Sequence, residues 1–138
     1  MKLEPNSTFG SSSEVRRTDM NLEEALSIIF AETDASGEGL LVAVKSGDDP
    51  GAARMRALNS ALGFLFQTLE GQTELNRRLA AALFSLGSDV PLTISSWASK
   101  GHLWRKDFME GEVYEMLMWV QSIFEGKWLE PEQAETVH

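Results

Sequence analysis

"DPGAARMRALNSALGFLFQTLEG", residues 49–71, carries the clearest helix signal in this chain. Asp49 offers a side-chain acceptor for a helix N-terminus, and Pro50 has a backbone φ that suits the first helical turn. Gly71 supplies a helix stop. Between them, apolar side chains recur at intervals of three and four residues, which predicts a helix with one apolar seam for packing on other helices. The seam consists of Met55, Leu58, Leu62, Leu65 and Leu69.

The segments on either side of this seam predict two further helices. Asn21 and Glu24 have the spacing of a capping box and precede a run of apolar residues at helical intervals. Thr73 is suited to cap the helix that follows the seam, and Gly87 to end it. Because the break between these two helices is only a few residues long, we expect them to form an antiparallel hairpin at the centre of the fold.

Two other segments predict a small β-sheet. The run "LLVAVK", residues 40–45, is rich in β-branched side chains and is bounded by glycines, as a short strand would be. After Pro91, two runs with partial alternation flank "ASKG", so residues 92–106 predict a β-hairpin, with a helix as the alternative. The expected fold class is therefore α+β and mainly helical, with about four helices around a two- or three-stranded sheet.

Length and composition predict one domain. A chain of 138 residues fits a single globular unit over residues 19–128, preceded by a serine-rich, disordered lead-in at 1–18 and followed by a frayed acidic tail at 129–138. Apolar runs are much shorter than the ~20 residues that cross a bilayer, and no secretory signal is visible at the N-terminus. The absence of cysteine excludes disulfides. We expect a cytoplasmic protein without membrane contact, either a monomer or a homodimer.

The charge distribution favours a basic protein partner. The formal net charge is -9, and residues 110–138 hold seven acidic side chains and one basic one. Such a field repels phosphate backbones, so nucleic-acid binding is not expected. An acidic surface instead attracts a basic protein and speeds its capture.

The sequence offers one arrangement for nucleophilic catalysis. His102 is followed by Asp107 and preceded by serines at 95, 96 and 99, so this segment contains the residue types of a Ser-His-Asp site. None of these serines lies in a G-x-S-x-G elbow. A small hydrolase centred on His102 is therefore an alternative hypothesis, and a histidine in a surface turn is the favoured interpretation.

No cofactor or metal is predicted. The segment that starts at Asp34 has acidic and serine side chains at the first, third and fifth positions of a calcium loop. Lys45 stands at the twelfth position, where the ion needs a bidentate glutamate. The glycines form neither of the common nucleotide-binding loop patterns.

The last predicted helix, residues 108–126, has more apolar surface than one core face requires. Asp107 and Glu110 have capping-box spacing at its start, and Gly126 is placed to end it. Rotation at ~100° per residue puts one set of apolar side chains within a single arc, which predicts the core face. This core face consists of Val113, Met116, Leu117, Val120, Ile123 and Phe124.

The remaining aromatic, methionine and acidic side chains of this segment predict a surface for a protein partner. Interface cores are enriched in aromatic residues and methionine, and charged residues gather at the rim. We call this surface the partner face and expect a non-enzymatic binding module, most concretely a bacterial immunity or antitoxin protein that covers the active site of a basic toxin. A dimeric secretion chaperone for an effector protein is the second hypothesis. The partner face consists of Tyr114, Glu115, Met118, Trp119, Glu125 and Trp128.

Overall fold

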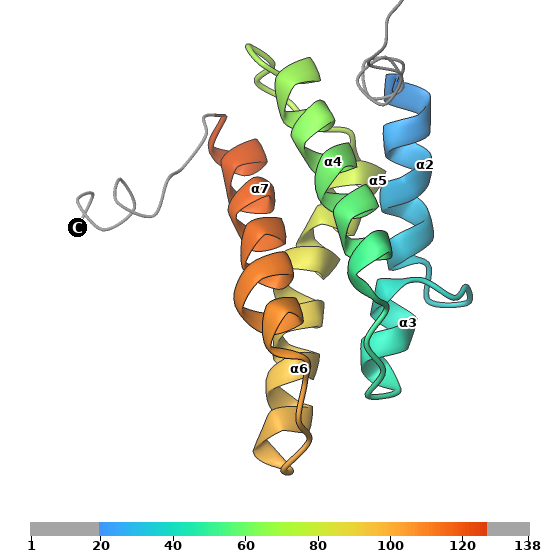
Figure 1. Cartoon of the computed structure of the whole chain (residues 1–138). Helices are drawn as coiled ribbons and strands as arrows, with labels where there is room; N and C mark the ends of the chain where they lie inside the picture. Colours follow the sequence, from blue (N-terminus) through green and yellow to red (C-terminus); the bar gives the residue numbers. More distant parts are fainter. Residues whose placement is uncertain (1–19, 127–138) are drawn as a thin grey trace, which may run out of the picture.

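The computed structural model describes residues 20–126 as a bundle of helices (Figure 1). Helix α4 (Ala52–Thr68) lies between α2 (Leu22–Thr33) and α7 (Val113–Glu125). A long helix behind these three begins as α5 and ends as α6. The described residues include no β-strand. The prediction of an α+β fold with a two- or three-stranded sheet is therefore wrong, and the described fold is all-α.

The predicted strand at residues 40–45 is the short helix α3 (Leu40–Lys45). Its first backbone N–H, on Leu40, donates to Oε1 of Glu32 at 2.7 Å, so a buried side chain from α2 begins the helix. Oε2 of Glu32 also accepts from Arg54 of α4 at 2.8 Å. A run of five apolar residues fits either a strand or a helix, and here the contact between Leu40 and Glu32 of α2 favours the helix.

The predicted hairpin at residues 92–106 is also wrong, and the alternative prediction of a helix is correct for residues 92–99. One continuous helix runs through α5 (Arg77–Phe84), the π-helical turn η1 (Ser85–Asp89) and α6 (Val90–Ser99). In η1 the backbone N–H of Val90 donates to the carbonyl oxygen of Ser85, five residues back. Pro91 has no N–H to continue the ordinary α-helical pattern, and the wider π turn accommodates this loss.

Gly87 therefore does not end a helix as predicted. It lies within η1, where a Cβ atom would approach Cγ1 of Val120 to 3.2 Å. The missing side chain lets η1 pack closely against α7. The sequence predicted a helix end at Gly87 because glycine is common at helix ends. In the structure, Gly87 instead allows η1 to lie close to α7.

The apolar seam of α4 is confirmed. Met55, Leu58, Leu62 and Leu65 are fully buried, and Leu69 packs against the same core. The start of α4 lies later than predicted: Gly51 is the N-cap residue, and Asp49 accepts the backbone N–H of Gly51.

The predicted caps of the other helices have mixed outcomes. The capping box of Asn21 and Glu24 is confirmed, with both reciprocal hydrogen bonds formed. Asn76, three residues after the predicted Thr73, caps α5 by accepting the backbone N–H of Leu79. The side chain of Asp107 forms no cap hydrogen bond, because helical backbone already surrounds it where the π turn η2 (Phe108–Glu112) begins.

The continuous helix Arg77–Ser99 is long and apolar enough to cross a membrane by length and composition. It is the one such helix among residues 20–126. A core helix of a soluble protein meets the same two conditions, and Leu83, Leu86 and Val90 of this helix are fully buried in the bundle. The length and composition of this helix are therefore not evidence that it spans a membrane.

The buried side of α7 is rotated relative to the prediction. Val113, Met116, Val120 and Ile123 are buried as expected, whereas Phe124 is 50% exposed. Leu117 is partly buried at the edge of the core. The core side extends instead toward Trp119, which packs on α4. A helical wheel gives the width of an apolar arc but does not locate the neighbouring helix.

This rotation predicts unequal costs of truncation within α7. Met116→Ala should lower the free energy of unfolding by about 2–5 kcal/mol, because it leaves a cavity in a fully buried position. Phe124→Ala should cost less than about 1 kcal/mol, because half of that side chain already meets solvent. Urea denaturation of both variants measures the difference. Equal losses would show that Phe124 belongs to the core.

The approach of Gly39 to α2 predicts a second stability difference. In Gly39→Ala, the new Cβ would collide with the carbonyl oxygen of Ala31 and lie 2.5 Å from Cα of Glu32. We expect a loss of about 1–3 kcal/mol or more in the free energy of unfolding, because backbone atoms cannot rotate away. Gly111→Ala is the matched control, since its Cβ would meet no atom within 4 Å. A Gly39→Ala protein as stable as this control would contradict the contact.

Candidate binding surface

The partner face is only partly exposed. Tyr114 is 47% exposed, and Glu115 and Glu125 also lie on the surface of α7. Met118 is 9% exposed, so its expected exposure is wrong. Trp119 is partly buried. Trp128 lies outside the described residues, as do the predicted lead-in and tail.

Trp119 is fixed at the junction of α7 with α4. Its indole N–H donates to Oε2 of Glu115 at 3.1 Å. Its ring lies 5.8 Å from that of Phe66, measured between centroids, and a Cβ on Gly63 would approach it to 3.0 Å. Glycine at this position therefore admits the indole, and Glu115 holds its polar edge.

A cavity of about 400 Å³ lies beside Trp119, between α4 and α7. Asn59 of α4 lines it and is 4% exposed. The side-chain amide of Asn59 donates to the backbone carbonyl of Glu112 at 3.1 Å, which fixes the orientation of the amide. Its oxygen Oδ1 is buried and accepts no hydrogen bond from residues 20–126. An unsatisfied buried acceptor lowers the stability of the folded state by ~1–3 kcal/mol, so Asn59 weakens the contact between α4 and α7.

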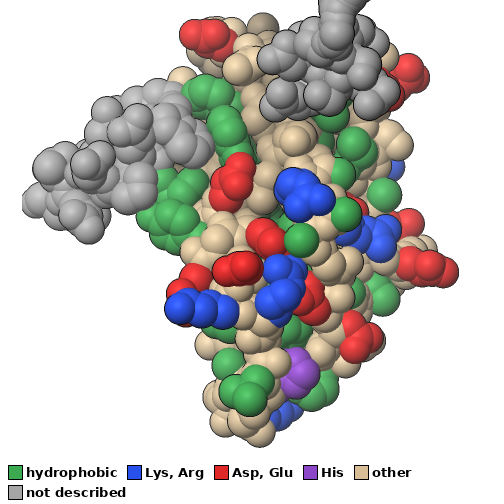
Figure 2. Space-filling view, viewed as in Figure 1, with side chains coloured by type: hydrophobic (Ala, Val, Ile, Leu, Met, Phe, Trp, Pro, Cys, Tyr) green, Lys and Arg blue, Asp and Glu red, His purple; other side chains and the backbone are tan. Residues whose placement is uncertain are grey.

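Arg105 joins two segments of the same side of the molecule. Its guanidinium donates to Asp49 at 2.6 and 3.2 Å and to Glu112 at 2.7 and 3.0 Å. The hydrogen bonds from Arg105 lower the pKa of Asp49, and the two carboxylates raise the pKa of Arg105 above its ordinary range. This double pair connects the loop before α4 with η2. Figure 2 shows charged side chains of both signs gathered over the face formed by α4 and α7.

His102 lies in a cluster of aromatic side chains. Its ring centroid is 5.5 Å from that of Trp97 and 4.6 Å from that of Trp104, and the Trp104 ring also contacts Phe108. Among the described residues, no hydrogen bond joins His102 to a serine hydroxyl or to Asp107. The arrangement required for the hydrolase hypothesis is therefore not assembled around this side chain.

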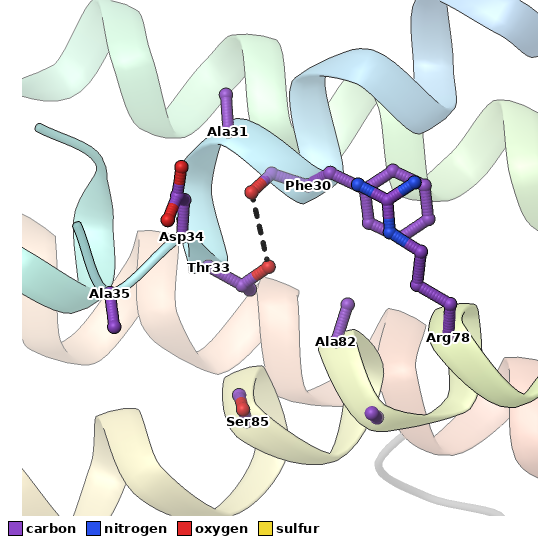
Figure 3. Close-up of a pocket in the computed structure, with 9 residues that line it drawn as sticks. Phe30, Ala31, Thr33, Asp34, Ala35, Arg78, Ala82 and Ser85 are labelled. Carbon is purple, nitrogen blue, oxygen red and sulfur yellow. Dashed lines mark hydrogen bonds between the residues drawn. The ribbon is translucent and has the colours of Figure 1, made fainter. Parts of the chain in front are cut away.

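A separate open cleft of about 500 Å³ lies where α2 ends beside α5 and η1 (Figure 3). Arg78 places its guanidinium over the ring of Phe30, 4.0 Å from the centroid. Asp34 lies at the other end of the cleft. Sequence reasoning considered Asp34 only as a calcium ligand and did not find Arg78.

Within residues 20–126, no group of three or more histidine, aspartate or glutamate side chains is arranged to hold a metal ion. Sequence reasoning missed Asn59 and named no specific partner for Arg105. Glu112 is seven residues from Arg105 in the sequence, whereas Asp49 is 56 residues away and no local pattern indicates that pairing. For Asn59 a signal existed, because a polar residue interrupts the apolar seam directly after Leu58.

Comparison with known proteins finds no significant match of this chain to a protein-family model, to a curated protein or to a solved structure.

The double pair of Arg105 predicts a pH-dependent loss on substitution. Arg105→Gln should lower the melting temperature near neutral pH, because Asp49 and Glu112 lose their shared cation. The depressed pKa of Asp49 means that its ionised form contributes stability at higher pH, and this contribution is lost as pH falls through that pKa.

The gap in melting temperature between the unchanged protein and Arg105→Gln should therefore narrow below about pH 4. Thermal melts between neutral and acidic pH measure it. Lys106→Gln is the control, since it removes the same charge from an exposed neighbour. A gap independent of pH would contradict the role assigned to Asp49.

Proposed function

We propose that this chain is a non-enzymatic, acidic protein-binding module of the bacterial cytoplasm that captures a basic protein through the partner face. The main support is the arrangement on α7. Exposed Tyr114 stands among acidic side chains, beside a tryptophan that is held in place by Glu115 and α4. A rigid aromatic group loses little conformational entropy on binding, which suits it as an anchor.

The specific role we propose is that of an immunity or antitoxin protein that covers the active site of a basic toxin. Glu115 and Glu125 lie on the exposed side of α7, and the chain as a whole has a net charge of -9. This field would steer a basic toxin toward the partner face and disfavour acidic competitors. Tyr114 would then slow dissociation by burying its ring in the interface.

A dimeric secretion chaperone is the second candidate. Its support comes from apolar side chains exposed elsewhere in the described residues: Phe84 is 63% exposed, Leu92 67% and Leu103 91%. Such side chains could contact an unfolded effector segment or a second copy. The His102 hydrolase receives no comparable support. The His102 ring contacts Trp97 and Trp104, and among the described residues no hydrogen bond joins it to a serine hydroxyl or to Asp107.

Co-expression with the protein encoded by the adjoining gene tests the immunity role. If that protein stops growth of a host cell, this chain should restore growth. Tyr114→Ala should weaken binding of the purified toxin by about 2 kcal/mol while shifting the melting temperature little. Restored growth by a Tyr114→Ala protein with unchanged affinity would contradict the partner face.

Charge reversal separates steering from contact. Glu125→Lys should slow association more than it speeds dissociation, and added salt should reduce the effect, because rim charges act over distance. Glu23→Lys on α2 makes the same charge change away from α7 and serves as the control. Surface plasmon resonance measures both rates. Equal slowing by the two variants would point to net charge alone, without a localised face.

A further inference from the structure

The cleft between α2 and the α5–η1 helix is separate from the partner face, and its lining includes no residue of α7. Its volume of about 500 Å³ falls within the range of ~300–1,000 Å³ common for small-ligand sites. Small side chains line part of its wall, which leaves room between the polar groups. These small residues are Ala31, Ala35, Ala81 and Ala82.

Arg78 is the cationic group of this cleft. The ring of Phe30 supports its guanidinium from one side at 4.0 Å, an arrangement that favours the cation and orients its plane. Among the described residues, Arg78 forms no salt bridge. Its N–H donors therefore remain available, and a guanidinium fork matches the two oxygens of a carboxylate.

Asp34 is the anionic group, and Figure 3 places it at the opposite end of the cleft from Arg78. Its Oδ1 accepts from the backbone N–H of Ser36 at 3.0 Å and from the Ser36 hydroxyl at 2.9 Å. These hydrogen bonds lower the pKa of Asp34, so the side chain is a carboxylate at neutral pH. They hold Oδ1 in a turn, and Oδ2 forms no hydrogen bond with the described residues.

Two hydroxyl groups lie between the charged ends (Figure 3). Thr33 donates its hydroxyl hydrogen to the backbone carbonyls of Ile29 and Phe30, so its oxygen can only accept from a ligand. The hydroxyl of Ser85 has no hydrogen-bond partner among the described residues, so it can donate or accept. The middle of the cleft therefore suits a group with both an N–H and a carbonyl.

The charges of the lining exclude simple ions as good ligands. A free anion would meet Asp34 and the net charge of -9, and a free cation would meet Arg78. A dipolar molecule satisfies both ends without a net charge. A peptide group in its centre would also match the two hydroxyls, which an alkyl chain would not.

We propose that this cleft binds a short peptide-like dipolar ligand, with its carboxylate on Arg78 and its ammonium on Asp34. The ligand lies along the alanine wall, and its central amide contacts Thr33 and Ser85. The site is additional to the proposed capture of a basic protein and does not depend on it.

Trialanine with free termini is the first probe, titrated into the full chain and followed by NMR. We expect saturable shifts at residues of the cleft at concentrations up to about 10 mM. N-acetyl-trialanine lacks the ammonium and trialanine amide lacks the carboxylate, so each should bind at least about tenfold more weakly. No saturable shift with trialanine, or equal binding of all three, would overturn the proposal.

Paired variants test which end binds which group. Arg78→Gln should weaken trialanine binding at least about tenfold but leave the weak binding of trialanine amide unchanged. Asp34→Asn should weaken trialanine but leave N-acetyl-trialanine unchanged. Arg77→Gln, at an adjacent exposed arginine outside the cleft, is the control for charge. Equal weakening by Arg77→Gln and Arg78→Gln would reduce the effect to net charge and overturn the assignment.

An end-blocked peptide with glutamate and lysine side chains identifies the source of the ligand. If it binds as tightly as trialanine and loses affinity in both cleft variants, the dipolar ligand is a pair of charges within a longer protein chain. If only trialanine binds, the cleft accepts free short peptides. Both results support the dipolar site, and shifts confined to the partner face with either probe would contradict it.

Discussion

The burial of α4 between two other helices is the constraint on which the rest of this fold depends. Four residues of its apolar seam are fully shielded from solvent, and Leu69 is partly buried. Other side chains of α4 contact each neighbouring helix. Arg54 pairs with Glu32, which also begins α3; Asn59 binds the backbone of η2; and Gly63 admits the indole of Trp119. Apolar burial thus supplies the main driving force, and a few polar or size-specific contacts set where the neighbouring helices lie.

The sequence predicted the elements whose information is local. The seam of α4 and the capping box of Asn21 follow from spacing alone, and both are present. Residues 40–45 were predicted wrongly because their helix starts on a carboxylate eight residues earlier in the chain. The hairpin prediction failed because Pro91 looks like the end of a helix unless a π turn precedes it. These errors added a sheet to the predicted fold but did not affect the prediction of its central helix.

For the candidate surfaces too, local features were predictable from the sequence and long-range contacts were not. Exposure of Tyr114, Glu115 and Glu125 followed from their positions on an amphipathic helix. The exchange of Met118 and Phe124 between inside and outside depends on where α7 meets its neighbours, which no periodicity reveals. Arg105 and Arg78 acquire their roles from side chains 56 and 48 positions away, at Asp49 and Phe30. Such pairings become visible only when the helices are assembled.

The two π turns have a consequence for how this chain tolerates changes in length. A π turn holds one more residue than an α-helical path between the same ends, so η1 acts as a phase adjustment between α5 and α6. Losing one residue in η1 would restore an ordinary helix and leave α6 in phase with α5, whereas losing one residue within α5 would rotate the side chains beyond it by ~100°. Val90 and Ile94 would in that second case turn away from the core together. Single-residue deletions are thus better tolerated in η1 than in the α-helical parts on either side, where they change the facing of every side chain beyond them.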